Sequence, residues 1–146
     1  MNLFVDRDLG KKLGKALRVV GVPVTNHIDR YPKADAESVP DRIWIAEAAG
    51  LGEIIITRDG GIRRIAAELE AVVTAGARCF VLETGNASAF DYLRAIMVAW
   101  PAMQRAVEGQ PAPFMYGVNR AGRLRRRFPE PSAPGAPLSS EDGTRT

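Results

Sequence analysis

The sequence predicts an α/β domain with a mostly parallel sheet of four or five strands and helices on both faces. Short runs of β-branched and other apolar residues alternate with longer segments whose apolar residues recur at helical spacing. Such alternation is typical of strand–helix–strand units, in which neighbouring strands are parallel and helices pack on the sheet. The length of 146 residues suits one domain with one core.

Five apolar segments have the length and composition of strands, and the last of them is expected to lie at an edge of the sheet. The clearest contains three consecutive isoleucines, which are typical of a strand buried on both faces. The edge segment is expected to expose Phe114, Met115 and Tyr116, which would favour a homodimer. The segments are 2–5, 22–24, 53–57, 77–83 and 111–118.

Four helices are expected, with a long connection over residues 25–40. Asp8 is expected to cap the first helix and Gly21 to end it. Pro101 is expected to kink or divide the last helix, because proline lacks an N–H and crowds the preceding turn. The helices are expected over 8–21, 41–50, 62–74 and 88–108. Their expected core contacts are Leu9, Leu13, Leu17 and Val20, then Ile43, Trp44 and Ala48, and finally Phe90, Leu93, Met97, Trp100 and Val107.

Composition excludes several kinds of chemistry. The one cysteine, Cys79, lies in an apolar run and is expected in the core, and it permits neither an intramolecular disulfide nor a Cys-rich zinc site. The one histidine, His27, excludes a two-histidine mechanism, and no nucleophile-elbow motif accompanies it. Hydrolytic chemistry in this chain would therefore depend on carboxylates.

The net charge of +3 is concentrated in one segment. Residues 117–128 contain five arginines and no acid, which is the form of a nucleic-acid contact and equally of a solvated junction to a tail. The folded domain is expected to span 1–128, because 129–146 is rich in Pro, Ser and Gly and is expected to be disordered. With no apolar run long enough for a membrane span and no signal-peptide pattern, we expect a cytoplasmic protein.

Three aspartates are placed where a parallel sheet would gather them. Asp6 directly follows the first strand, Asp59 follows the isoleucine strand by two residues, and Asp41 opens a helix. The carboxyl ends of parallel strands meet at one edge of the sheet, where ligands bind. Carboxylates this close repel one another unless a cation lies between them, and hard oxygen ligands suit Mg²⁺ or Mn²⁺. The pattern therefore favours a metal site for phosphodiester hydrolysis.

The order of these motifs resembles the PIN-like domains related to VapC-type toxins. The resemblance rests on FVDRDLGKKLGKALRVVGVPV, on PDRIWIAEAAGLGEIIITRDGGIRR and on ARCFVLETGNAS followed by a long helix and PAPFMYGV. It covers about residues 1–125 and implies a three-layer domain with a metal-dependent ribonuclease activity, frequently that of a toxin with a partner antitoxin. It assigns Asp6, Asp41 and Asp59 to catalysis and to binding Mg²⁺ or Mn²⁺.

Other candidate site residues follow with less support from the motifs. The resemblance places Thr57 and Asn86 at the edge of the site, and Arg58, Arg63 and Arg64 are candidates for binding RNA phosphates. The sequence departs from the family pattern in lacking a fourth acid shortly after Asp59, where Gly60, Gly61, Ile62 and Arg63 stand. Asp8, Glu37 and Asp91 are the candidate replacements.

Two alternative functions stay open at this point. The segment FVDRD also matches the motif of haloacid dehalogenase-like phosphatases, in which Asp6 would be a covalent nucleophile and Asp8 an acid/base. The missing fourth acid and the arginine cluster also suit a non-catalytic module that binds RNA or protein. The number of metal ions and the RNA target are not specified by the motifs.

Overall fold

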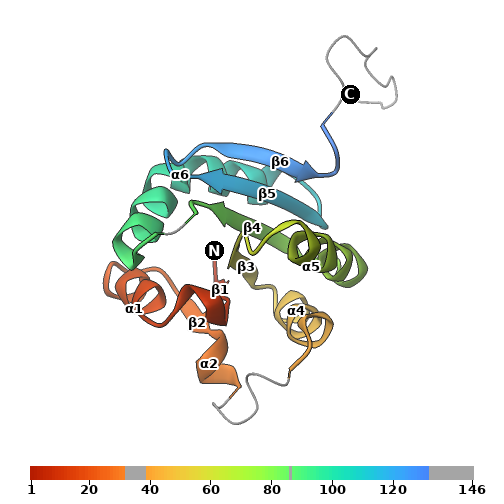
Figure 1. The fold of residues 1–146 in the computed structure, drawn as a ribbon, viewed down its shortest axis with the longest axis horizontal. Coiled ribbons are helices and arrows are strands. Elements are labelled where there is room, and N and C mark those ends of the chain that lie inside the picture. Colours follow the sequence, from red (N-terminus) through yellow and green to blue (C-terminus); the bar gives the residue numbers. More distant parts are fainter. Residues whose placement is uncertain (32–38, 86, 132–146) are drawn as a thin grey trace.

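The computed structural model describes residues 1–31, 39–85 and 87–131 and contains one six-stranded sheet in the order β2-β1-β3-β4-β5-β6 (Figure 1). The first five strands along the chain are parallel to their neighbours, and β6 pairs antiparallel with β5. The strands are β1 Leu3–Val5, β2 Val24–Asn26, β3 Ile54–Arg58, β4 Arg78–Glu83, β5 Phe114–Asn119 and β6 Leu124–Phe128.

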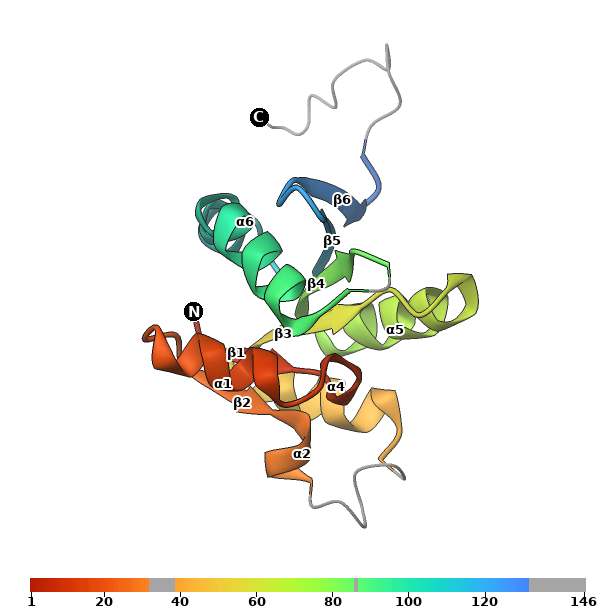
Figure 2. The ribbon, with the colours of Figure 1, turned by 60° about the vertical axis from the view of Figure 1, so that its left-hand side comes forward.

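Helices cover both faces of this sheet, which confirms the predicted fold class (Figure 2). Helices α1 and α6 pack on one face, and α4 and α5 pack on the other. The helical elements are η1 Arg7–Leu9, α1 Lys12–Val19, α2 His27–Arg30, α4 Asp41–Gly50, α5 Ile62–Ala75 and α6 Ala89–Gly109. Among the described helices, none combines the length and apolarity that a bilayer crossing requires.

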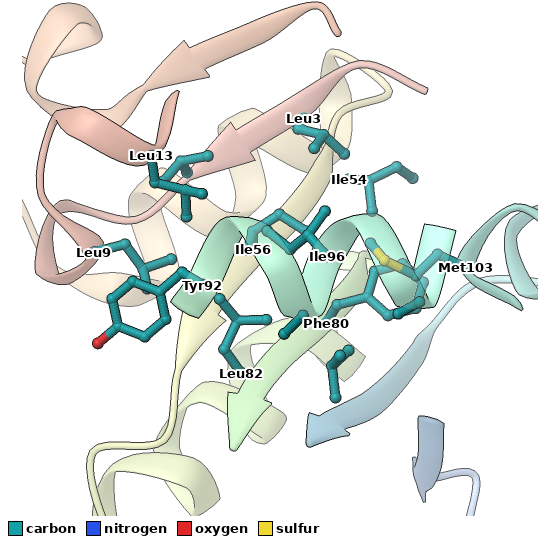
Figure 3. Close-up of a cluster of buried hydrophobic side chains, with 14 of the residues drawn as sticks. Leu3, Leu9, Leu13, Ile54, Ile56, Phe80, Leu82, Tyr92, Ile96 and Met103 are labelled. Atoms are coloured by element: carbon teal, nitrogen blue, oxygen red, sulfur yellow. The ribbon is translucent and has the colours of Figure 1, made fainter. Parts of the chain in front are cut away.

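Side chains alternate between the two faces along each strand, and this alternation creates two cores. Leu3 and Val5 contribute to the core beneath α1 and α6, which Figure 3 shows with Tyr92 and Ile96 of α6 over the sheet. Phe4, which lies between them, contributes to the core beneath α4 and α5. The predicted burial of Cys79 is confirmed, because it lies in this second core.

The sheet has one strand more than expected, and this corrects the prediction for its edge. Strand β5 lies between β4 and β6, and Phe114 and Met115 are fully buried while Tyr116 is half-buried. The expected exposed edge was therefore wrong, and the argument for a homodimer built on it no longer holds. The arginine-rich segment forms the edge strand β6. Of the expected disordered tail 129–146, only 129–131 belong to the described residues.

Several expected helix faces and boundaries were also wrong. The buried face of α6 is shifted by one position from the expected face: Phe90 is 71% exposed and Met97 is 37% exposed. Val20 lies beyond the end of α1 and is exposed, and Ile43 is exposed while Ile45 takes its place. The buried face of α6 consists of Tyr92, Ala95, Ile96, Ala99, Met103 and Ala106, with Leu93, Trp100 and Val107 packed at its margin.

The elements near the first two strands begin later than expected. Asp8 lies inside η1 rather than capping a helix, and α1 begins only at Lys12. Strand β2 starts at Val24, so part of the expected long connection 25–40 is strand and helix α2.

Helix α6 is not divided at Pro101 and continues to Gly109.

A helical glycine allows α1 to pack tightly on the end of β2. A Cβ at Gly14 would overlap the buried carboxamide of Asn26, whereas a Cβ at Gly50, in the last turn of α4, would meet open space. Gly14→Ala should therefore lower the free energy of unfolding by about 1–3 kcal/mol, because the packed core cannot accept the extra methyl group. Gly50→Ala, the matched control, should leave it unchanged or raise it by up to about 1 kcal/mol. Urea denaturation of both variants checks this, and equal effects would contradict the packing described here.

Candidate active site

Asp6 is held at the carboxyl end of β1 and its carboxylate is buried. Its backbone N–H donates to the carbonyl oxygen of Ile56 at 2.9 Å, which continues the pairing of β1 with β3. By strand alternation Asp6 projects on the same face as Phe4, toward α4 and α5. The hydroxyl of Thr57, on β3, lies 2.9 Å from Asp6 Oδ2. Asp6 is 4% exposed and Thr57 is 1% exposed, so burial raises the pKa of Asp6, opposed by Arg64 and Thr57.

A second buried carboxyl group, Glu68 of α5, joins this pair. Glu68 Oε2 lies 3.1 Å from the same Thr57 hydroxyl, and Oε1 is buried without a hydrogen-bond partner in the described part of the chain. Burial raises the pKa of Glu68 to about 7. A hydroxyl has one proton to donate, so Thr57 satisfies both carboxyl groups only when one of them is protonated. A proton on Glu68, donated to Thr57, leaves the Thr57 proton for Asp6.

The guanidinium of Arg64 binds to the carboxylates of this cluster. Arg64 Nη2 lies 2.8 Å from Asp6 Oδ2, Nη1 forms an ion pair with Asp8, and Nε is 3.6 Å from Glu68 Oε2. Arg64 lies in the first turn of α5, one helical turn before Glu68, and its side chain is 29% exposed. Asp8 therefore belongs to the site as a partner of Arg64, although it does not cap a helix.

Asp41 lies near this cluster at the start of α4. Its Oδ1 accepts a hydrogen bond from Trp44 Nε1 at 3.0 Å, which holds the side chain against its own helix. Its negative charge contributes to raising the pKa of both Asp6 and Glu68. The structure thus brings Asp6, Asp8, Asp41 and Glu68 into one electrostatic environment.

Asp59 belongs to a different group of charges, between β3 and the edge of the sheet. It is exposed, accepts a hydrogen bond from Gly61 N–H at 2.9 Å, and pairs with Arg127 of β6 at 3.3 Å. Arg127 also pairs with Glu83, which in turn binds Arg125 at 2.7 Å. The Glu83 carboxylate passes over β5 at Gly117, where a Cβ would overlap it.

The remaining candidates are dispersed. Asp91 forms the capping box of α6 with Ser88, and hydrogen bonds from the Ser88 backbone and hydroxyl lower its pKa. Arg58 Nε is buried without a hydrogen-bond partner among the described residues, and Arg63 is exposed. Asn86 and Glu37 lie outside the described residues.

His27 is a buried aromatic neighbour rather than part of the carboxylate cluster. Its ring packs against Phe4, Tyr31 and Trp44 at centroid distances of 5.0–5.9 Å. Burial and the charge of Arg7 lower the pKa of His27, so the neutral form is favoured. The chemistry of this edge therefore depends on carboxylates and their basic partners.

The Asp6 cluster has the donor chemistry that a divalent ion needs. As arranged, no three Asp, Glu, His or Cys side chains in the described ranges converge to hold a metal ion. Three carboxylates nevertheless contact one cationic group, and Glu68 Oε1 is a buried oxygen with no hydrogen-bond partner among the residues that the structure describes. Carboxylate oxygens are the ligands that Mg²⁺ and Mn²⁺ prefer, so these residues offer suitable donor atoms for such an ion, at a position where the Arg64 guanidinium now lies.

Comparison with known proteins identifies the family. The sequence model described as a PIN like domain matches residues 1–84, the part of the chain that contains the Asp6 cluster. The chain belongs to the PIN-like domain family. It is also similar to the putative ribonuclease VapC45 of Mycobacterium tuberculosis (strain ATCC 25618 / H37Rv), with 34% identity over 119 residues that cover 81% of this chain and 86% of the relative. No solved structure matches. Membership in this family favours the nuclease hypothesis over the phosphatase hypothesis.

Glu68 is the functional candidate that sequence reasoning missed. It lies within an ordinary amphipathic helix and has no motif around it, so its spacing resembles that of a solvated residue. One signal was present: Glu68 is three and four residues before Ala71 and Val72, which are buried, and therefore shares their helix face. An acid on the buried face of a helix requires a partner, and here the partner is Thr57.

The raised pKa of Glu68 makes the stability of the protein depend on pH. The pKa is about 7 in the fold against 4.5 for a free glutamate, so the folded state binds more protons between these values and its stability falls as pH rises. In the absence of metal, the free energy of unfolding of the wild type should fall between pH 5 and 8, and Glu68→Gln should reduce this fall by up to about 3 kcal/mol. Urea denaturation in EDTA at several pH values checks this. Glu70→Gln is the control, because Glu70 is an exposed neighbour on the same helix. Equal pH slopes for the wild type and Glu68→Gln would contradict the assignment.

Proposed function

We propose that this PIN-like protein is a metal-dependent endoribonuclease that hydrolyses RNA with water as the nucleophile. The observation that carries the proposal is the buried carboxylate cluster around Asp6, at the carboxyl ends of two parallel strands. Support also comes from the similar protein from Mycobacterium tuberculosis, which is named a putative ribonuclease. The chain offers carboxylates for this reaction and no histidine pair.

Asp6, Asp41 and Asp59 are the proposed metal ligands, with Mg²⁺ or Mn²⁺ as the ion. Asp6 is the best placed, because Thr57 holds Oδ2 and the strand holds the backbone. Asp59 would have to leave Arg127 to take part. The chemistry that such an ion supplies is activation of water and neutralisation of charge on the phosphate.

The chain's own residues would hold the RNA next to Asp6. A pocket of about 220 Å³ beside Asp6 is lined by Arg7 and Lys11 as well as by Asn26 and His27. Cations at this rim would bind the phosphates that flank the scissile bond. Arg58 and Arg63 remain proposed RNA contacts at the end of β3, whereas Arg64 binds carboxylates. In β6, Arg125 and Arg127 pair with Glu83, so the arginine-rich segment is partly neutralised.

A toxin of a toxin–antitoxin pair is the biological role that this activity would serve. In that role a cognate antitoxin protein would cover the site and block access of RNA. The reaction would take place in the cytoplasm, where RNA is available.

Asp6→Asn should lower the rate of RNA cleavage in Mn²⁺ by more than about 100-fold, because the amide removes the charge and one metal-binding oxygen. Cleavage of a fluorescent RNA by the purified protein measures this, and circular dichroism checks the fold. Asp29→Asn is the matched control, since Asp29 is exposed and its carboxylate pairs with Arg18 rather than with a residue of the Asp6 cluster. Cleavage by Asp6→Asn at the wild-type rate would contradict the proposal.

The same assay separates the alternatives. If the wild-type protein binds RNA but does not cleave it in Mn²⁺, it is a non-catalytic module. The ion pair between Arg64 and Asp6 would suit that alternative, because it occupies the carboxylate that a metal ion would need. A phosphoenzyme trapped on Asp6 would indicate the phosphatase. The proposal requires cleavage that EDTA abolishes and added Mn²⁺ restores.

A further inference from the structure

The Arg64 side chain depends on a glycine in the segment where the family pattern has an acid. A Cβ at Gly60 would overlap Arg64 Cδ and lie 3.3 Å from both Nε and Nη1. The backbone of Gly60 is not in the left-handed region, unlike that of Gly61. Space for Arg64, rather than backbone conformation, is therefore what Gly60 provides. Gly60 thus leaves room for the guanidinium of Arg64 beside the Asp6 cluster.

The cluster around Arg64 contains more carboxyl groups than cationic groups. One guanidinium faces the carboxyl groups of Asp6, Asp8 and Glu68, and the side chains of Asp6 and Glu68 are only 5% and 1% exposed. Glu68 Oε1 stays without a hydrogen-bond partner in the described structure. A guanidinium thus leaves one buried oxygen unsatisfied, which a divalent ion with several oxygen ligands would bind.

Arg64 can leave the cluster without disturbing the core. It is in the first turn of α5, its side chain is 29% exposed, and its long side chain can turn toward solvent. Asp6, in contrast, is held by the backbone of β1 and β3, and Glu68 lies on the buried side of α5. The carboxylates are therefore fixed and the cation is exchangeable.

We propose that Arg64 is a built-in counter-ion which a divalent ion must displace from the Asp6 site, and that Glu68 becomes a further ligand of that ion. The proposal rests on the metal dependence of the proposed function. It assigns to Glu68 the place of the acid that the sequence lacks after Asp59. It also makes Gly60 a residue that weakens metal binding, because Gly60 lets Arg64 reach the carboxylates.

Titration of the full-length protein with Mn²⁺, followed by electron paramagnetic resonance of the free ion at fixed pH, tests this. Arg64→Gln should bind Mn²⁺ about tenfold more tightly than wild type. Gly60→Ala, which keeps the charge but displaces the guanidinium, should bind several-fold more tightly. Arg105→Gln is the matched control, because it removes the same charge from an exposed position on α6. Adding Glu68→Gln to Arg64→Gln should abolish the gain.

The outcomes distinguish this inference from the function on which it rests. Unchanged or weaker binding by both Arg64→Gln and Gly60→Ala, with folded protein by circular dichroism, would overturn the role of Arg64. An equal gain in Arg105→Gln would reduce it to a general charge effect and overturn it too. Tight binding that survives Glu68→Gln would remove Glu68 as a ligand. If wild type and all variants fail to bind Mn²⁺, the proposed function fails as well.

Discussion

The burial of the Asp6 carboxylate determines how the elements around it are arranged. A carboxylate that is 4% exposed has lost most of its hydration, so it requires hydrogen bonds and an opposite charge. Thr57 and Arg64 supply both at the same oxygen, Oδ2. Thr57 in turn contacts Glu68, and Arg64 reaches Asp6 because Gly60 has no side chain. Asp6 Oδ2, at the end of β1, thus contacts side chains from both β3 and α5.

The same edge of the sheet holds a second group of charges with a different character. Asp59 and Glu83 share Arg127, and the Asp59 and Glu83 side chains are 35% and 15% exposed, against 5% and 1% for Asp6 and Glu68. Asp6 and Glu68 are buried, so loss of hydration raises the pKa of both groups, and the neighbouring charges shift these pKa values further. Chemistry that needs a strong local field is therefore better supported at Asp6 than at Asp59.

Local sequence was sufficient for much of the fold and for Asp6 itself. The isoleucine run of β3 and the apolar run of β1 form strands because of their own composition, and the acid that follows β1 must lie at its carboxyl end. Strand β6 was not predictable from its arginines, because it depends on pairing with β5 and on ion pairs with Glu83. Likewise the partner of Asp59 is 68 residues away, and the position of Glu68 follows from the packing of α5 on Thr57.

The most direct test of this account is anomalous diffraction from crystals soaked in Mn²⁺. If Mn²⁺ displaces Arg64 from the Asp6 cluster, an anomalous peak should lie within about 2.0–2.6 Å of carboxylate oxygens of Asp6 and Glu68. In the same map the guanidinium of Arg64 should have turned away from Asp6. A peak between Asp59 and Glu83, or no peak at saturating Mn²⁺ with Arg64 still bound to Asp6, would contradict the account.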